Sequence, residues 1–314
     1  MAKAGPTLNI LAGVTAAGKT SLALEWASQN NAEIISCDAV SVYKGMDIGS
    51  AKPTIKEREW VPHHGIDLFE INETSDVLKY YSFTRQKVQE ILQRGKSILV
   101  VGGSGFYLHS FFAPVVDGVE IPDEVRRRVD MWYAEGGLEE ILGRLEKLNP
   151  DGTGDLDRHN PRRVVRALER CLASGKTLSA LKFEFDQLPK PFSDLPKRVI
   201  WLDRENQDLE NRISIRTQKM LDHGLLQEIR DLIDAGILKN ESASSSIGYR
   251  EGIACVMGDI PRDEIKARID SATRKLVSKQ RKWFRKHLDS RSRLVLQADD
   301  DIGANDLPWF DTVS

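Results

Sequence analysis

The 314-residue chain contains only three cysteines and no long apolar run. Cys37, Cys171 and Cys255 are odd in number, far apart and without metal-site spacing. No stretch approaches the ~20 apolar residues that a membrane-spanning helix needs, and the N-terminus, MAKAGPTLNI, lacks the apolar core of a secretion signal. These absences argue against a disulfide-rich secreted protein or a membrane protein. We expect a cytoplasmic protein with no membrane partner, whose cysteines are small buried hydrophobic residues.

The chain also lacks a strong net charge: 45 lysines and arginines stand against 47 acidic residues, which gives −2 at pH 7. This balance argues against a wholly basic nucleic-acid-binding surface but leaves local basic clusters open. Hydrophobic residues make up 40% and charged residues 29% of the chain, as is typical of a folded globular protein. The length suffices for one large core domain and a smaller one.

The clearest motif lies in residues 8–21, LNILAGVTAAGKTS. The apolar run 8–12 predicts a buried strand and residues 21–26 a helix. Between them lies the pattern of glycine, four residues, glycine, lysine and Ser/Thr, whose backbone N–H groups bind phosphate at a helix start. We therefore predict a phosphate cradle, with Thr20 able to hold Mg²⁺, formed by Gly13, Val14, Thr15, Ala16, Ala17, Gly18, Lys19 and Thr20. The alternative is a glycine-rich turn that binds nothing.

Strand and helix patterns alternate in the first part of the chain. Apolar runs predict strands at 33–37, 62–69, 97–101 and 198–202, and helical spacing predicts a helix over 76–93. This alternation indicates an α/β fold, an open parallel sheet with helices on both faces.

A second region contains helical patterns without a convincing strand. It holds predicted helices at 122–135, 138–148 and 161–174, so we expect residues 116–196 to form a helical insertion. Residues 1–115 and 197–314 then form the catalytic core, with further helices at 206–223, 225–235 and 262–288. The acidic tail from Gln297 is expected to be loosely held.

Polar residues follow several of the predicted strands. Parallel sheets bind ligands at the carboxyl ends of their strands, so we expect Asp38 and Ser104 to face the phosphate held by Lys19, in a crevice that Asp203 also borders. Asp38 could be a general base, a magnesium ligand or a turn-forming residue. Ser104 could contact phosphate or cap the glycine turn that precedes it.

Basic residues recur at helical spacing on three predicted helices. They are Arg162, Arg163, Arg166 and Arg170; Arg212, Arg216, Lys219 and His223; and Arg274, Lys275, Lys279, Arg281, Lys282, Arg285 and Lys286. No acidic residue lies between Ser271 and Leu288, although a solvated helix normally mixes signs. We therefore favour a positive groove for a polyanion over three independent solvated faces. The segment 246–250, SIGYR, adds an aromatic ring and an arginine suited to base stacking.

Taken together, the segments resemble the bacterial tRNA dimethylallyltransferases, also called tRNA isopentenyltransferases. The cradle alone is common to many ATP-binding and other nucleotide-binding proteins, whereas DAVSVYKGMDIGSAKP at 38–53 followed by VPHHGID at 61–67 is far more specific. The remaining matching segments are VVGGSGFYL at 100–108, NPRRVVRALE at 160–169, RTQKMLDHGL at 216–225, SIGYREGI at 246–253 and SKQRKWFR at 278–285.

The resemblance implies a P-loop NTPase-like core and a prenyl transfer. A dimethylallyl group would pass from dimethylallyl diphosphate to the exocyclic amine of the adenine 3′-adjacent to the anticodon, with the tRNA anticodon stem-loop as partner and Mg²⁺ as cofactor. We expect a monomer. The cradle would hold the donor's diphosphate, with Thr15, Lys19, Thr20 and Arg216 as contacts and Ser104 in place of a usual threonine. Asp38 would be the general base.

The resemblance further implies a set of tRNA contacts in four segments. They are Asp38, Ala39, Val40, Ser41, Arg162, Arg163, Arg166, Ile247, Gly248, Tyr249, Arg250, Lys279, Gln280, Arg281, Trp283 and Arg285. Val14 departs from the family's usual proline, and Ala17 from a usual Ser/Thr, which removes one hydroxyl contact to phosphate. The alternatives are an adenylate isopentenyltransferase, a P-loop small-molecule kinase and a non-catalytic RNA-binding module.

Overall fold

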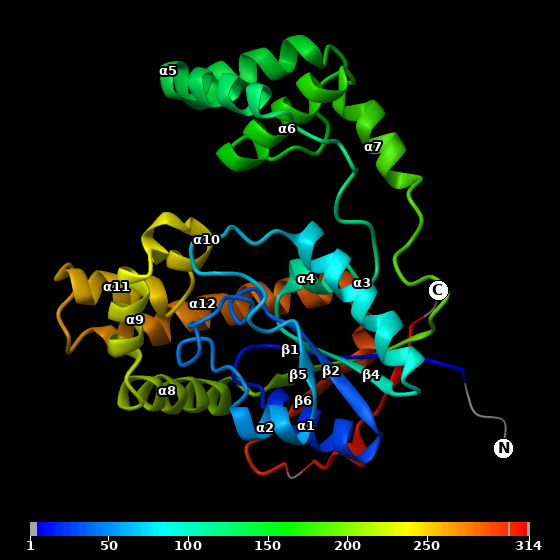
Figure 1. Ribbon diagram of the computed structural model, residues 1–314, viewed down its shortest axis with the longest axis vertical. Coiled ribbons are helices and arrows are strands. Elements are labelled where there is room, and N and C mark those ends of the chain that lie inside the picture. The colour runs from blue at the N-terminus through cyan, green and yellow to red at the C-terminus, as the bar shows by residue number, and fades with distance from the viewer. Residues whose placement is uncertain (1–4, 301, 313–314) are drawn as a thin grey trace. The chain divides into compact units, whose positions relative to one another are not determined.

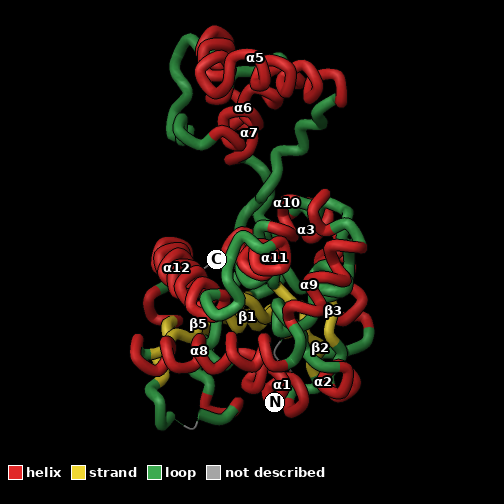
Figure 2. The backbone as a smooth tube through the Cα atoms, turned by 90° about the vertical axis from the view of Figure 1, so that its left-hand side faces the viewer, coloured by secondary structure: helices red, strands yellow, loops and turns green. Residues whose placement is uncertain are grey.

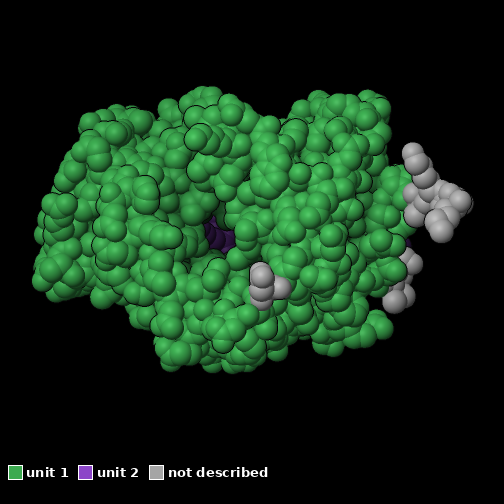
Figure 3. Space-filling model, turned by 90° about the horizontal axis from the view of Figure 1, so that it is seen from below, with its two compact units in different colours: residues 1–112, 192–314 green, residues 113–191 purple. Residues whose placement is uncertain are grey.

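The computed structural model describes residues 5–300 and 302–312. The chain forms two compact units, Met1–Phe112 with Phe192–Ser314, and Ala113–Pro191, which are coloured separately in Figure 3. The second unit overlaps the helical insertion expected from the sequence.

A seven-stranded sheet forms the centre of the first unit. Its strands are β1 (Leu8–Gly13), β2 (Ala32–Cys37), β3 (His63–His64), β4 (Ser97–Gly102), β5 (Lys197–Arg204), β6 (Arg293–Leu296) and β7 (Phe310–Asp311). The order is β3-β2-β4-β1-β5-β6, all parallel, and β7 pairs antiparallel with β5. Every residue of β1 is buried, as expected for a central strand covered on both faces. The predicted α/β fold with a parallel sheet is confirmed.

Two strand predictions need correction. The strand predicted at 62–69 is continuous only over His63–His64, because Gly65 turns the chain with a φ of 83°, and Phe69 at its far end forms an isolated bridge with Tyr43. The tail expected to be loose contributes β7 at the edge of β5, and β6 precedes it. β6 and β7 are too short for an apolar strand pattern to be recognised in the sequence.

Helices cover the sheet (Figure 2). In the first unit they are α1 (Lys19–Gln29), α2 (Ile55–Trp60), α3 (Val77–Gln93), α4 (Gly105–His109), α8 (Asn206–Asp222), α9 (Leu225–Asp234), α10 (Glu241–Ser244), α11 (Tyr249–Met257) and α12 (Ile265–His287). The connections β1–α1–β2 and β3–α3–β4 cross the sheet in opposite directions. Right-handed crossovers therefore place α1 and α3 on opposite faces (Figure 1).

The second unit is helical, with α5 (Asp123–Leu148), α6 (Pro161–Ser174) and α7 (Leu178–Asp186). Gly137, at φ 62° and ψ −156°, interrupts α5, which accounts for the two helices predicted there. The Asn160 side chain caps α6, Pro161 opens its first turn, and Gly175 ends it in the left-handed conformation. The buried core consists of Val129, Ile141, Leu145, Val164, Ala167, Leu168, Cys171 and Leu181. In the part of the chain that the structure describes, no helix is long and apolar enough to cross a membrane.

Candidate active site

The loop between β1 and α1 has the shape that its glycines predict. A Cβ at Gly13 would lie 2.9 Å from the carbonyl oxygen of Leu202 on β5, so only glycine fits there. Gly18 precedes α1 with a φ of 95°, which favours glycine. The N–H of Val14 donates to Leu202 O at 3.1 Å and ties the loop to the sheet. Since the loop lies at the carboxyl ends of parallel strands and at a helix start, it is built to hold an anion.

Lys19 is the inward-pointing cation of this loop. Its ammonium donates to the carbonyl oxygens of Gly13 at 2.9 Å and Val14 at 2.8 Å. Burial, and then the positive charge of Arg216, lowers the pKa of Lys19 to about 8, whereas Asp38 raises it. Lys19, Arg216 and Asp38, which lie far apart in the sequence, therefore share one electrostatic environment.

Arg216 reaches this environment from α8. Its Nη2 donates to Ser50 O at 3.4 Å, and its Nε is buried without a partner among the described residues. Burial lowers the pKa of Arg216, and Asp38 raises it. A buried, unsatisfied guanidinium N–H next to a phosphate-type loop suits an anionic ligand.

The basic face predicted on α8 divides into two parts. Arg212 donates through Nε to Ala16 O at 2.9 Å, and Arg216, which is partly buried, acts electrostatically on Lys19 of the loop. Lys219, one turn on, is exposed. The first two residues thus belong to the anion site rather than to a solvent-facing groove.

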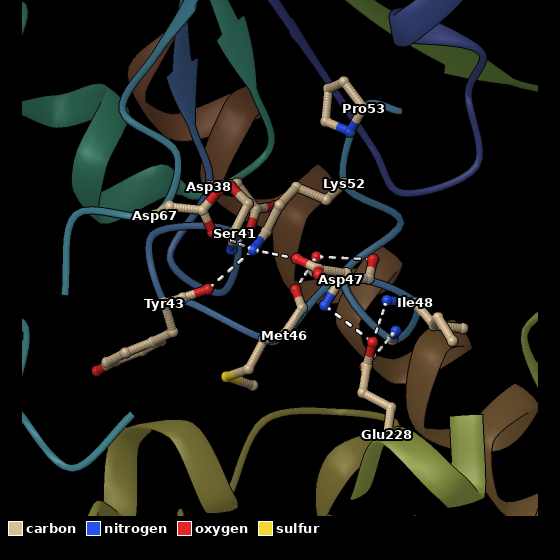
Figure 4. Close-up of polar contacts among 12 residues, drawn as sticks. Asp38, Ser41, Tyr43, Met46, Asp47, Ile48, Lys52, Pro53, Asp67 and Glu228 are labelled. Carbon is tan, nitrogen blue, oxygen red and sulfur yellow. Dashed lines mark hydrogen bonds and ion pairs between the residues drawn. The ribbon is translucent and has the colours of Figure 1, made fainter. Parts of the chain in front are cut away.

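Asp38 directly follows β2 and forms a turn. Its Oδ1 accepts from the N–H groups of Val40 at 2.8 Å and Ser41 at 3.1 Å, and Figure 4 shows it among the residues of the following loop. The turn-forming role is therefore realised. The turn is compatible with a general-base role for Asp38, because Oδ2 accepts no hydrogen bond within residues 5–300 and 302–312.

The second glycine loop, between β4 and α4, approaches the end of β2. A Cβ at Gly102 would lie 1.9 Å from Cys37 O, and the Ser104 N–H donates to the same oxygen at 3.4 Å. The Ser104 hydroxyl makes no capping hydrogen bond at the start of α4, so a capping role does not account for it. Ser104 and Asp38 are thus brought to neighbouring strand ends, as the topology predicts.

Comparison with known proteins identifies the family. The family model described as IPP transferase matches residues 41–287. The chain belongs to this IPP transferase family. The tRNA dimethylallyltransferase of Opitutus terrae is 48% identical over 289 residues, which cover 92% of this chain and 93% of that protein. The tRNA dimethylallyltransferase of Protochlamydia amoebophila is 37% identical over 88% of this chain and 80% of its own.

Solved structures of the IPP transferase family share the fold. The tRNA delta(2)-isopentenylpyrophosphate transferase of Staphylococcus epidermidis has a TM-score of 0.65 and 28% identity, over 96% of this chain and 95% of that one. A eukaryotic dimethylallyltransferase, described as acting on tRNA, has a TM-score of 0.76 and 26% identity, over 94% of this chain and 75% of that one. The P-loop-like core and the family resemblance inferred from sequence are confirmed.

Several of the tRNA contacts implied by the IPP transferase resemblance lie inside the protein. Tyr249 is fully buried and donates its hydroxyl to Glu228 at 2.7 Å, so its ring cannot stack on a base. Gly248 is also buried. Ser41 is 4% exposed, with its hydroxyl 3.2 Å from that of Ser36. All three residues therefore lie within the folded core.

Two residues of the 278–285 segment also point inward. Gln280 accepts from the Thr15 N–H at 2.9 Å and donates to Gly103 O at 2.9 Å, so it bridges the two glycine loops. Arg281 pairs with buried Asp203 at 2.8 Å and donates to Arg204 O at 2.7 Å. Asp203 is therefore a structural ion-pair partner and not a ligand of the crevice, and Arg281 is committed to the core.

The outer face of α12 retains a basic surface. Its exposed cations pair with no acid in the described part of the chain: Arg274, Lys275, Lys279, Lys282, Arg285 and Lys286. Trp283 packs against Gly105, where a Cβ would lie 2.6 Å from the ring, and stacks on His287 with ring centroids 4.5 Å apart. We call these six cations the α12 basic face.

The remaining predicted tRNA contacts differ in their surroundings. Arg250 pairs with Glu251, and Arg166 pairs with Glu169 at 3.3 Å. Exposed positions are Ala39, Arg162 and Arg163, and partly buried ones are Val40 and Ile247.

Proposed function

We propose that this protein transfers a dimethylallyl group from dimethylallyl diphosphate to the exocyclic amine of the adenine 3′-adjacent to the anticodon of tRNA. The observation that carries the proposal is the meeting of Lys19, Arg216 and Asp38 at one loop. Two cations there suit a leaving diphosphate, and one carboxylate suits the proton of an amine. The names of the curated relatives, tRNA dimethylallyltransferase, support the same reaction.

The anion site acts on the leaving group. As the bond between the allylic carbon and oxygen breaks, negative charge grows on the diphosphate. The N–H groups at the start of α1, Lys19 and Arg216 stabilise that charge. The hydroxyls of Thr15 and Ser104 are further proposed contacts, from the two glycine loops that border the site. Burial strengthens each of these interactions.

Asp38 acts on the nucleophile. An adenine amine is a poor nucleophile, and removal of its proton as the new carbon–nitrogen bond forms helps the reaction. Oδ1 is held by the turn to Val40 and Ser41, which leaves Oδ2 to accept the proton. The adenine must leave its stack to reach this partly buried carboxylate, as in other enzymes that modify bases.

Thr20 fits a Mg²⁺ ion that is held mainly by the substrate. Its hydroxyl lies exposed in the first turn of α1, next to the anion site. Residues 5–300 and 302–312 contain no cluster of three or more His, Cys, Asp or Glu that could hold a metal. This agrees with Mg²⁺ taking one protein oxygen and its other ligands from diphosphate and water. Bound there, Mg²⁺ would neutralise part of the diphosphate charge.

The α12 basic face is the proposed contact for the tRNA backbone, since an unpaired row of cations suits phosphates. Further proposed contacts are Trp283, Ala39, Val40, Ile247 and Arg250, with Arg162, Arg163 and Arg166 of the second unit. We propose that the protein is cytoplasmic and that it works as a monomer. Sedimentation with and without tRNA would check the oligomeric state.

The test is incubation with labelled dimethylallyl diphosphate and Mg²⁺, with either tRNA or AMP as acceptor. We expect label in tRNA alone. Label in AMP would indicate an adenylate isopentenyltransferase instead. Label in neither acceptor would overturn the proposal, and phosphate transfer from ATP to a small molecule would then favour a kinase.

A further inference from the structure

Glu228, on α9, accepts hydrogen bonds through both carboxylate oxygens from a loop remote in sequence. Its Oε2 accepts from the N–H groups of Asp47 at 3.1 Å and Ile48 at 2.6 Å. Its Oε1 accepts from the N–H of Gly49 at 3.2 Å and the hydroxyl of Tyr249 at 2.7 Å. Figure 4 shows the Glu228 side chain pointing into this loop. Bonds to a charged acceptor are stronger than neutral ones, so the carboxylate fixes the path of residues 47–49.

Tyr249 holds the carboxylate and the loop together. Its ring lies against Gly49, where an added Cβ would come 2.6 Å from the ring. Burial, and then the charge of Glu228, raises the pKa of the Tyr249 hydroxyl, which therefore remains a donor. The loop is thus held between a buried ring and a carboxylate that accepts its N–H groups.

A second anchor holds the far end of the same loop. The buried ammonium of Lys52 donates to Tyr43 O at 2.9 Å and pairs with Asp67 at 2.6 Å and Asp47 at 2.5 Å (Figure 4). Ser50 lies between the two anchors, and its carbonyl accepts from Arg216 Nη2 at 3.4 Å. The backbone that orients Arg216 is therefore fixed on both sides.

We propose that Glu228 is a positioning residue for Arg216. It holds residues 47–49, which set the place of the Ser50 carbonyl, and that carbonyl orients the guanidinium toward the anion beside Lys19. Glu228 itself touches neither substrate. This inference rests on the proposed function, in which Arg216 binds the donor's diphosphate.

The test is Glu228→Gln, with donor affinity measured by calorimetric titration of dimethylallyl diphosphate with Mg²⁺. Glutamine presents an amide NH₂ where the loop needs acceptors, so we expect the donor Kd to rise about tenfold. We expect the Kd for tRNA to stay unchanged. The matched control is Glu210→Gln, the same chemical change at an exposed position of α8 that makes no contact with the loop.

A double-mutant cycle separates positioning from general loosening. If Glu228 acts through Arg216, Glu228→Gln adds no further rise to the donor Kd in an Arg216→Ala background. Additive effects, or an unchanged Kd in the single variant, would overturn the proposal. Should Glu228→Gln fail to fold, Tyr249→Phe removes one donor from the same carboxylate, and the same cycle applies with a smaller expected rise. A wild-type protein that transfers no label would contradict the proposed function instead.

Discussion

The side-chain oxygen of Gln280 accepts a hydrogen bond from the backbone N–H of Thr15 at 2.9 Å. The amide nitrogen of Gln280 donates at 2.9 Å to the carbonyl of Gly103. Because one loop supplies a donor and the other an acceptor, the orientation of the amide is determined. One face of α12 therefore joins the two glycine loops, while the α12 basic face points to solvent.

Gln280→Glu tests the loop-joining face of α12 and leaves the α12 basic face unchanged. The carboxylate keeps an acceptor for Thr15 but places an oxygen against the carbonyl of Gly103, so the loops are no longer joined. We expect kcat/KM for dimethylallyl diphosphate to fall about tenfold and the Kd for tRNA to stay unchanged. Lys279→Ala, at the adjacent exposed position, is the control and should weaken tRNA binding only. Loss of tRNA affinity alone in Gln280→Glu would contradict the bridging role.

Asp38→Asn tests the base apart from the turn. Asparagine keeps an Oδ1 acceptor for the N–H groups of Val40 and Ser41 but cannot take the amine proton. General base catalysis typically contributes a factor of at least about 100 to the rate, so we expect turnover to fall by at least that factor. We expect tRNA binding to stay nearly intact. Asp38→Ala, which also loses the turn, should fall at least as far. Wild-type turnover in Asp38→Asn would reduce Asp38 to a turn-forming residue.

Donor binding should weaken as the pH rises above about 8. Burial and Arg216 lower the pKa of Lys19 to about 8, and the diphosphate needs the protonated ammonium. Above that pH the free protein must take up a proton to bind, so its donor Kd rises with pH, whereas below it the Kd is level. Calorimetry from pH 7 to 9.5 would measure this. Lys19→Arg should remove the rise, because guanidinium stays protonated throughout, and a flat wild-type profile would contradict the assignment.

Salt dependence tests the α12 basic face. Each cation that pairs with a tRNA phosphate adds about 0.7 to 0.9 to the slope of log affinity against log salt. Lys279→Ala combined with Arg285→Ala should therefore reduce the slope for tRNA by about 1.4 to 1.8. Filter binding between 50 and about 200 mM salt covers the useful range. An equal slope in wild type and variant would mean that these side chains are only solvated.

Arg281→Ala should act on stability instead. It removes one of the two arginines that pair with Asp203, which is fully buried. Removing a partner of a buried ion pair costs about 3 kcal/mol of the free energy of unfolding. Urea unfolding would measure this, with the exposed Arg274→Ala as control. An unchanged midpoint would return Arg281 to the set of RNA contacts.

The sequence predicts the phosphate loop, Asp38 and Ser104 because their signals are local. A glycine spacing and a polar residue after an apolar strand place each of them at the carboxyl edge of a parallel sheet. Arg216 is harder to assign, since its spacing on α8 resembles a solvated basic face and only the family resemblance distinguishes it.

A segment that matches the family does not say which way a side chain points, and the side chains of Gln280, Arg281 and Tyr249, predicted as RNA contacts, make their contacts inside the protein. A signal is present for the first two: Val277 and Phe284 are buried, and positions 280 and 281 lie three and four residues from each, on the same side of the helix. Glu228 gives no signal at all. Its partners are backbone N–H groups of a loop, and only the folded chain brings them together.

The most direct measurement uses an anticodon stem-loop RNA with labelled dimethylallyl diphosphate, and the product nucleotide identified by mass spectrometry. A matched RNA carries hypoxanthine, which lacks the exocyclic amine, in place of the adenine 3′-adjacent to the anticodon. The proposed reaction predicts label on that adenine and none on the hypoxanthine RNA. Equal label on both RNAs, or label on neither, would contradict it.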